Sequence, residues 1–348
     1  MRTPSLRIRA AWCAFAATAI LTASVACDRG GIGPSSAGSP SAGSPAARSS
    51  VGSPSAGSAP ATSPADPAYL TARIRLGRRP CGVAAGQGRV WVSNFVDGTV
   101  QWVDAATHRA SAPIPVGRQP CGIALGAGSV WVENFGSANV TRIDAATGQV
   151  LATIGVGSQP YDVTFAAGAV WVTDWADDTV SRIDPATNAR TVIATGDRPA
   201  GIVAAGGGVW VGLMTDGVAV RIDPTTRRVT DRVPTGAGAS WTAAADGSVW
   251  LSNGAARTVT RINAASRRAV ATVPVEASPL DGDAAGGAIW IPVNNGGLYR
   301  IDPATNAITG PYRSGVTLPF VAAGLGDELW IADYAGTDLV RLDATAIR

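Results

Sequence analysis

The chain has 348 residues, 15% of them charged, with 28 arginines, no lysine and 25 acidic residues. Three of the arginines lie within the first nine residues, so the remainder carries 25 basic and 25 acidic side chains. No more than two arginines are adjacent anywhere, and this lack of a basic stripe excludes a nucleic-acid-binding protein.

Residues 1–26 have the composition of a secretory signal. Arg2, Arg7 and Arg9 precede an apolar run, Ala10–Ala26, that ends in small residues directly before Cys27. A basic start, a short apolar segment and a small-residue cleavage site are typical of exported proteins. At 17 residues the run is at the lower limit for a membrane-spanning helix. We therefore expect a signal peptide rather than a membrane span.

The segment Ala-Ser-Val-Ala-Cys at 23–27 resembles the lipobox of bacterial lipoproteins, with Ser24 where leucine is usual. In that family the cysteine is lipidated and becomes the mature N-terminus. The resemblance implies an extracytoplasmic protein anchored to the cell membrane through Cys27, since buried acyl chains favour the bilayer. The alternative is an ordinary signal peptide followed by an incidental cysteine.

Residues 27–66 consist almost entirely of Gly, Ser, Pro and Ala, with variants of Ala-Gly-Ser-Pro at 37–40, 42–45 and 56–60. Such a segment has too little apolar surface to offset the entropy of ordering it, so we expect a disordered linker. As a flexible coil it would span on the order of 35 Å, which suits a spacer between an anchor and a folded domain.

After the linker, tryptophans recur at intervals of 39 or 40 residues, at Trp91, Trp131, Trp171, Trp210, Trp250, Trp290 and Trp330. A fixed period of this length predicts a repeat architecture. Within the second unit, short apolar stretches lie at 117–124, 129–135, 139–144 and 149–156, separated by turn residues. Four short antiparallel strands per unit are typical of a propeller blade. We predict an all-β, seven-bladed β-propeller over residues 67–348, with the tryptophans between the sheets.

The ends of the repeat region predict how the ring closes. The seventh unit ends after the stretch 339–343, which leaves room for three strands. Residues 69–76 match the fourth-strand pattern of the other units. We expect this N-terminal strand to complete the last blade and to cover its open edge.

The pattern Val-Trp-Val-x-Asn-Phe, followed by Arg-Ile-Asp-x-Ala-Thr and Val-Gly-x-x-Pro, resembles the YVTN repeats of β-propellers. From Tyr69 to Arg348 the chain is also similar to the streptogramin (virginiamycin B) lyase family, which has seven comparable units. That family linearises a cyclic depsipeptide by elimination, with a metal ion and a histidine base. The resemblance implies the fold, and it offers lyase activity as a hypothesis.

The single histidine argues against that activity. His108 lies in the expected turn between the third and fourth strands of blade one. This turn is on the opposite face from the loops where function normally collects, so we interpret His108 as a turn residue. The catalytic residues of the lyase family cannot be transferred to any position in this chain.

The candidate site lies where the repeats differ. On a propeller, the Gly-x-x-Pro loops and the residues just after each blade tryptophan share one face around the central channel. The aromatic residues expected on this face are Phe95, Phe135, Tyr161, Trp175, Trp241, Phe320 and Tyr334. The carboxylates expected there are Glu133, Asp162, Asp174, Asp281 and Asp333.

Aromatic side chains with a few polar groups are what a ligand or peptide site uses. We therefore predict a binding module for an unknown small molecule, peptide or protein. The alternative is that these side chains only fill the channel. We expect a monomer without catalysis or a cofactor. A metal-dependent lyase or a lactonase-like hydrolase, with Ca²⁺ or Mg²⁺ held by carboxylates at the channel mouth, is the second hypothesis.

Cys81 and Cys121 occupy the same slot in adjacent blades. In an exported protein disulfides persist, and equivalent positions near the axis come close together. A disulfide between them and a pair of buried thiols are both compatible with the sequence.

Overall fold

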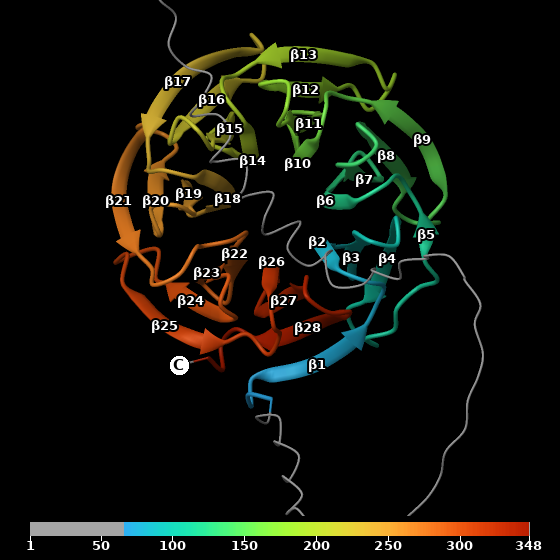
Figure 1. The fold of residues 1–348 in the computed structure, drawn as a ribbon, viewed down its shortest axis with the longest axis vertical. Helices are drawn as coiled ribbons and strands as arrows, with labels where there is room; N and C mark the ends of the chain where they lie inside the picture. The colour runs from blue at the N-terminus through green and yellow to red at the C-terminus, as the bar shows by residue number, and fades with distance from the viewer. Residues whose placement is uncertain (1–65, 348) are drawn as a thin grey trace, which may run out of the picture. The chain divides into compact units, whose positions relative to one another are not determined.

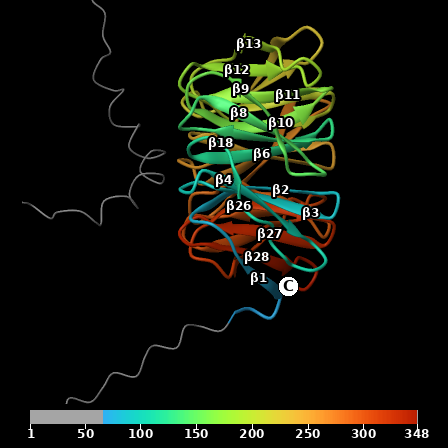
Figure 2. The same ribbon diagram turned by 90° about the vertical axis from the view of Figure 1, so that its right-hand side faces the viewer.

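A computed structural model describes residues 66–347, which form seven four-stranded antiparallel sheets and no helix. Figure 1 shows the sheets arranged radially around a centre, and Figure 2 shows them from the side. The predicted all-β, seven-bladed propeller is confirmed. The described residues contain no helix that could cross a membrane. The expected signal peptide, Cys27 and the linker to residue 65 lie outside the described residues.

Each blade runs outward from the central axis in chain order. The innermost strands are β2 (Pro80–Gly86), β6 (Pro120–Gly126), β10 (Pro160–Ala166), β14 (Pro199–Ala205), β18 (Ala239–Ala245), β22 (Asp283–Ala285) and β26 (Pro319–Leu325). The second strands carry the periodic tryptophans: β3 (Arg89–Asn94), β7 (Ser129–Asn134), β11 (Ala169–Asp174), β15 (Gly208–Leu213), β19 (Ser248–Asn253), β23 (Ala288–Pro292) and β27 (Glu328–Asp333).

The two outer strands complete each sheet. The third strands are β4 (Thr99–Asp104), β8 (Asn139–Asp144), β12 (Thr179–Ile183), β16 (Val218–Asp223), β20 (Thr258–Asn263), β24 (Gly297–Ile301) and β28 (Asp338–Asp343). The outermost strands are β5 (Ile114–Pro115), β9 (Val150–Gly155), β13 (Arg190–Ala194), β17 (Arg228–Pro234), β21 (Arg268–Pro274), β25 (Ile308–Arg313) and β1 (Leu70–Arg75).

The ring closes through strand β1, as the sequence predicts. This strand pairs antiparallel with β28, with Arg73 opposite Val340, and gives the last blade the order β1-β28-β27-β26. The Arg73 guanidinium also donates to Asp338 at 2.9 Å and to the carbonyl of Gly315 at 2.8 Å. The N-terminal strand therefore supplies the fourth strand that the C-terminal end of the repeat region lacks.

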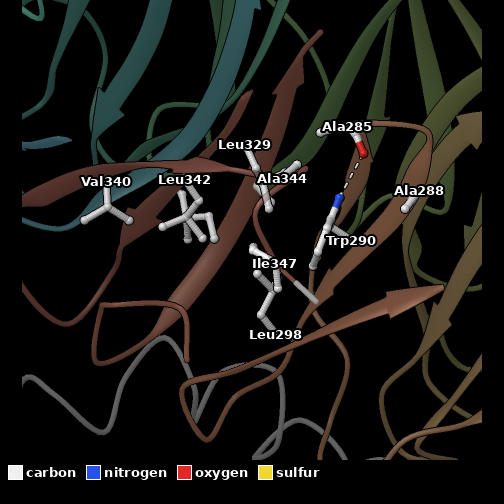
Figure 3. Close-up of a cluster of buried hydrophobic side chains, with 11 residues drawn as sticks. Ala285, Ala288, Trp290, Leu298, Leu329, Val340, Leu342, Ala344 and Ile347 are labelled. Carbon is white, nitrogen blue, oxygen red and sulfur yellow. Dashed lines mark hydrogen bonds between the residues drawn. The ribbon is translucent and has the colours of Figure 1, made fainter. Parts of the chain in front are cut away.

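The seven periodic tryptophans lie between neighbouring blades, and each is at most 1% exposed. Trp171, for example, belongs to an apolar cluster that also contains Val209 and Val220 of the next blade. Figure 3 shows the equivalent cluster between blades six and seven, where Trp290 donates to the Ala285 carbonyl at 2.9 Å. Burying these large rings is what holds one sheet against the next.

Two repeated turns position the loops. After the third strand, Asp144 accepts hydrogen bonds from the backbone N–H groups of Ala146 and Thr147, which is the turn predicted from the Asp-x-x-Thr pattern. At the start of the Gly-x-x-Pro loop, the Gly117 N–H donates to Asn134 Oδ1 at 3.0 Å. Glycine is required there, because a Cβ on Gly117 would clash with the Asn134 side chain.

Candidate functional site

The variable loop positions meet at one end of the propeller. In every blade, the residue four positions after the tryptophan donates its backbone N–H to a carbonyl of the loop before the innermost strand. In six blades the acceptor is the residue just before that strand, whereas in blade six Ser278 lies five positions before the start of β22. The seven donor and acceptor pairs are Phe95–Arg79, Phe135–Gln119, Trp175–Gln159, Met214–Arg198, Gly254–Gly238, Asn294–Ser278 and Tyr334–Leu318. Both sets of loops expected to share a face therefore do share one.

Six aromatic rings on this face form one continuous network, which we call the aromatic network. Starting from blade one, its members in order of contact are Phe95, Tyr334, Phe320, Trp241, Tyr161 and Trp175. The centroids of neighbouring rings are 4.8–6.5 Å apart, and the closest pairs, Phe320 with Tyr334 and Tyr161 with Trp241, are stacked. Its members come from blades one, three, five and seven, so the network crosses the channel axis.

The network fills the end of the channel and has partly exposed rings at its margin. Tyr161 is 9% exposed and Trp241 6%, whereas Trp175 is only partly buried. The Arg198 guanidinium lies over the Trp175 ring at 4.8 Å, and the Arg79 guanidinium lies over the Tyr334 ring at 5.4 Å. The interior rings therefore pack as the filling alternative describes, while Trp175 at the margin offers ring surface beside the Arg198 cation.

Phe135 is the one aromatic residue of the predicted set that stays outside the network. Its backbone joins the same loop face through Gln119, and its side chain is partly exposed. Among the described residues it makes no ring contact with the other six.

Glu133 is fully buried in β7, in the slot where three other blades carry the hydroxyls of Ser93, Thr173 and Ser252. Its Oε1 accepts the N–H of Gly122 at 2.7 Å, and its Oε2 has no partner among the described residues. Burial raises the pKa of Glu133 well above its usual value, with a smaller contribution from the charge of Asp162.

Asp162 and Asp281 are surrounded by protein but keep some exposed surface, as expected for side chains that face a narrow channel. The Asp162 carboxylate accepts backbone N–H groups of Val163 at 2.8 Å and of Ile202, in the next blade, at 2.9 Å. Burial raises the pKa of Asp162 to about 7. Burial also raises the pKa of Asp281 well above its usual value, and the charges of Asp162 and Asp283 add to this effect.

The innermost strand of blade six, which begins after Asp281, is irregular. This strand, β22, has three residues where the other innermost strands have seven. Its neighbour β23 ends in Pro292, which has no N–H for a sheet hydrogen bond. The backbone around Asp281 instead pairs with blade seven, accepting a hydrogen bond from Ala322 at 3.0 Å and donating one to Phe320 at 3.3 Å.

Asp174 and Asp333 have structural roles on this face. The Asp174 carboxylate is fully buried and accepts hydrogen bonds from Gly157 at 2.8 Å and Ser181 at 2.6 Å, with Arg190 at 3.4 Å. Asp333 similarly accepts the Leu318 N–H at 3.0 Å. Both occupy the position of Asn134, whose side chain accepts a hydrogen bond from the first residue of the loop in its own blade. Their carboxylates therefore serve their own loops and do not face Asp162 and Asp281.

Two residues that the sequence did not suggest belong near the channel carboxylates. Asp283 accepts the N–H groups of Ala284 at 2.8 Å and of Gly324, in the next blade, at 2.9 Å, and burial raises its pKa. Thr242, which follows Trp241, is buried and its hydroxyl has no partner among the described residues. The Asp-Gly-Asp sequence at 281–283 was the available signal, since no other blade carries acids at both corresponding positions.

Cys81 and Cys121 form a disulfide between the innermost strands of blades one and two, with their Cα atoms 5.0 Å apart. These strands approach so closely that a Cβ on Gly82 would clash with the Cys121 carbonyl oxygen. The hydroxyl of Ser93 joins the same two strands, because it accepts the Gly82 N–H at 2.8 Å and donates to the Cys121 carbonyl at 2.7 Å.

His108 lies away from this group of residues. It is a turn residue with φ of 59°, and its ring packs against Trp330 at a centroid distance of 6.1 Å. Within residues 66–347, no three His, Cys, Asp or Glu side chains are grouped in an arrangement that could hold a metal ion.

Together these features define a seven-bladed β-propeller with an aromatic, carboxyl-lined channel mouth. Solved structures with the same fold include selenomethionine-substituted virginiamycin B lyase from Staphylococcus aureus. It aligns with a TM-score of 0.69 and 15% identity over 78% of this chain and 98% of the lyase. The catalytically inactive histidine-to-alanine variant of that lyase with quinupristin gives the same values.

A second enzyme has the same fold at similar sequence distance. Hydrazine synthase of Kuenenia stuttgartiensis aligns with a TM-score of 0.66 and 17% identity over 78% of this chain and 96% of the aligned chain. No protein family model matches this chain, and no curated protein matches it in sequence. At 15–17% identity these similarities show the fold alone.

Proposed function

We propose that the chain is a ligand-binding propeller, held outside the cytoplasmic membrane by a lipid anchor, whose site is the channel mouth. The observation that supports this function is the aromatic network, which brings residues from four blades together above buried carboxyl groups. Large rigid rings with a few polar groups are the usual composition of binding sites.

Unpartnered polar atoms at the same place support a binding role. Glu133 Oε2, the Thr242 hydroxyl and Trp175 Nε1 are buried and lack partners among the described residues. Buried polar atoms are nearly always hydrogen-bonded in folded proteins, to water or ligand where no protein group serves. A set of such atoms at one end of the channel is consistent with an occupant from outside the chain.

Nuclear magnetic resonance of ¹⁵N-labelled residues 67–348 tests this function. A panel of small metabolites and short peptides is added while the indole N–H signals of the tryptophans are followed. We expect at least one class of compound to shift the Trp175 and Trp241 signals and to leave the Trp171 signal, from the inter-blade layer, unchanged. Shifts confined to residues away from the channel mouth, or no shifts at all, would contradict the proposal.

The alternative is a metal-dependent lyase or lactonase-like hydrolase at the same place. The raised pKa of Asp162, about 7, favours this alternative, because a general base works best when its pKa is near the ambient pH. Incubating residues 67–348 with quinupristin and with simple lactones, with and without Mg²⁺ or Ca²⁺, tests it by mass spectrometry. Metal-dependent turnover that is lost in Glu133→Gln or Asp162→Asn would establish the enzyme.

The location needs its own experiment. We propose that Cys27 is lipidated and that residues 27–66 hold the propeller away from the membrane surface. Cys27→Ser in the full chain should release the protein into the medium, as measured by fractionation and immunoblotting. Membrane retention of the variant would contradict the anchor without bearing on the binding site.

A further inference from the structure

Within residues 66–347, the carboxyl groups of the channel have no cationic side chain as a partner. The ion pairs found among the described residues involve other acids, such as Asp97, Asp216 and Glu328. The groups that influence the channel carboxyls are one another and backbone N–H groups, and no arginine contributes to any of them. They are Glu133, Asp162, Asp281 and Asp283. A buried carboxylate is costly unless it is protonated or balanced by a positive charge.

The aromatic network lies directly against these acids. The Tyr161 hydroxyl is close enough to Asp162 and Asp281 that their charges, after burial, raise its pKa. Tyr161 in turn stacks on Trp241 at 5.0 Å. Ring faces carry negative potential and attract cations, so the rings and the carboxyls favour the same sign of charge.

Independent evidence for an occupant comes from an unpartnered polar atom beside the acids. The Glu133 side chain is fully buried, yet its Oε2 makes no hydrogen bond among the described residues. Glu133 and Asp162 are neighbours, because a Cβ on Gly122 would contact Glu133 Cγ at 3.1 Å and Asp162 Oδ1 at 3.2 Å. A carboxyl oxygen without a partner, beside a second acid, is complementary to a cation that donates hydrogen bonds.

The burial of the surrounding rings restricts which cation fits. Asp162 and Asp281 are partly exposed residues, whereas the surrounding Tyr161, Trp241 and Phe320 are each at most 9% exposed. A primary ammonium group is about as large as a water molecule and donates three hydrogen bonds, while a quaternary ammonium or a guanidinium is larger. No three acids are grouped for a metal ion in residues 66–347, which disfavours a chelated divalent cation.

We propose that the channel mouth binds an organic primary ammonium group, with Asp281 as its main hydrogen-bond acceptor, Asp162 as a second acceptor, and Tyr161 and Trp241 as the ring wall. This inference rests on the proposed function, because it names the ligand class of the same site. Asp281 is the main acceptor in this proposal because its carboxyl makes no hydrogen bond within the described residues, whereas both Asp162 oxygens already accept backbone N–H groups. The chain contains no lysine, so no side-chain ammonium of its own can occupy the site.

Titration of residues 67–348 with n-butylammonium chloride tests the proposal, with the Trp241 and Trp175 indole signals as the readout. We expect saturable binding, and no comparable binding of n-butanol, tetramethylammonium or Na⁺ at equal concentration. Asp281→Asn should weaken binding about tenfold or more, since a hydrogen bond to a charged group is lost. Asp197→Asn, at an exposed acid of the same loop face, is the matched control and should bind like the unaltered protein.

A measurement on the unaltered protein removes any dependence on folding of the variants. Binding a cation favours the charged forms of acids whose pKa values are raised, so binding should release protons. Calorimetry at pH 6.5 in two buffers of different ionisation enthalpy measures that release. A short peptide with one lysine and a blocked N-terminus, compared with n-butylammonium, then shows whether the ammonium comes from a protein side chain or a small amine.

Failure of this inference is distinguishable from failure of the proposed function. Equal binding of n-butanol, no effect of Asp281→Asn on the affinity, or no proton release would overturn the ammonium site. If other compounds still shift the Trp175 and Trp241 signals, the binding function stands with a different ligand class. If no compound shifts them, both proposals fail.

Discussion

Trp171 and Trp175 are four residues apart and have opposite environments. Trp171, in the inter-blade layer, is fully buried and donates its indole N–H to the Ala166 carbonyl at 3.0 Å. Trp175, at the channel mouth, is partly exposed, and its indole nitrogen is buried without a partner among the described residues. Trp171 completes its hydrogen bond within its own blade, whereas Trp175 does not. Trp250 of the inter-blade layer also has an indole nitrogen without a partner within residues 66–347, so exposure, rather than hydrogen bonding, separates Trp175 from the scaffold tryptophans.

Replacing each of these tryptophans by alanine should give very different losses of stability. Trp171→Ala leaves a cavity between two sheets and should lower the free energy of unfolding by about 3–5 kcal/mol. Trp175→Ala removes mainly a stacked ring and a cation–π contact, so the loss should be about 1 kcal/mol. Urea unfolding followed by circular dichroism measures both. Similar losses for the two variants would show that the channel mouth is as much a part of the scaffold as the inter-blade layer.

The disulfide is a variable feature that we assign to the scaffold. Cys81 and Cys121 are separated by 40 residues and join two innermost strands. The double variant Cys81→Ala with Cys121→Ala should lose about 3–4 kcal/mol of stability, because the bond restricts the unfolded chain. It should retain whatever ligand binding the channel mouth has. Loss of binding at temperatures where the double variant stays folded would place the disulfide in the site instead.

The repeat explains which parts of the fold were predictable. The tryptophan period and the four-strand pattern recur in every blade, and residues 69–76 match the strand that the seventh unit lacks, so these patterns predicted the architecture. The short strand β22 was not predicted, because it results from one proline, Pro292, in a neighbouring strand. An effect of one strand on a neighbouring strand produces no repeated pattern in the sequence.

The candidate site was only partly predictable, for a related reason. Six of the seven predicted aromatic residues meet in one network, since equivalent slots in a ring are close together near its axis. Asp174 was placed at the site by residue type, although Asn94, Asn134 and Asn253 in the same position indicated a structural role. Which side chains lack partners depends on distances of a few ångströms between blades, and no sequence pattern encodes that.

The pH dependence of stability separates channel acids from surface acids. Because folded Asp162 keeps its proton up to about pH 7, whereas the unfolded chain releases it near pH 3.8, folding takes up a proton between these values. Its contribution to the free energy of unfolding therefore falls as the pH rises through this window. Exposed acids such as Asp104, whose pKa is lowered by hydrogen bonds to Thr107, contribute in the opposite direction.

Asp162→Asn should remove the channel contribution. Asparagine cannot accept both backbone N–H groups, so the variant should be less stable than the unaltered protein at pH 5. The difference should shrink toward pH 8 by a Tm change on the order of a few degrees, because only the unaltered protein must then bury a charge. Calorimetric melting temperatures at the two pH values measure this. A difference that does not shrink between pH 5 and pH 8 would mean that Asp162 does not lose a proton in this range.

Replacing Glu133 by glutamine should have the smallest effect on stability. It also allows a direct comparison with the residues at the same slot in other blades. At the same slot, the hydroxyls of Ser93, Thr173 and Ser252 each donate to a carbonyl of the next blade, at 2.7–2.9 Å. A protonated Glu133 has a donor of the same kind at Oε2, while its Oε1 accepts the Gly122 N–H. Glu133→Gln keeps the shape, one acceptor and a donor, so we expect it to change the free energy of unfolding by less than about 1 kcal/mol.

Glu133→Ala is the contrasting variant at this position. It leaves the Gly122 N–H without an acceptor and should cost about 1–3 kcal/mol, which urea unfolding at pH 7 resolves from the glutamine variant. If glutamine destabilised the protein as much as alanine does, Glu133 would have to be charged in the folded state. A charged Glu133 would require a cation within the channel even in the absence of ligand. In that case Glu133 would not be equivalent to the hydroxyls that occupy its slot in other blades.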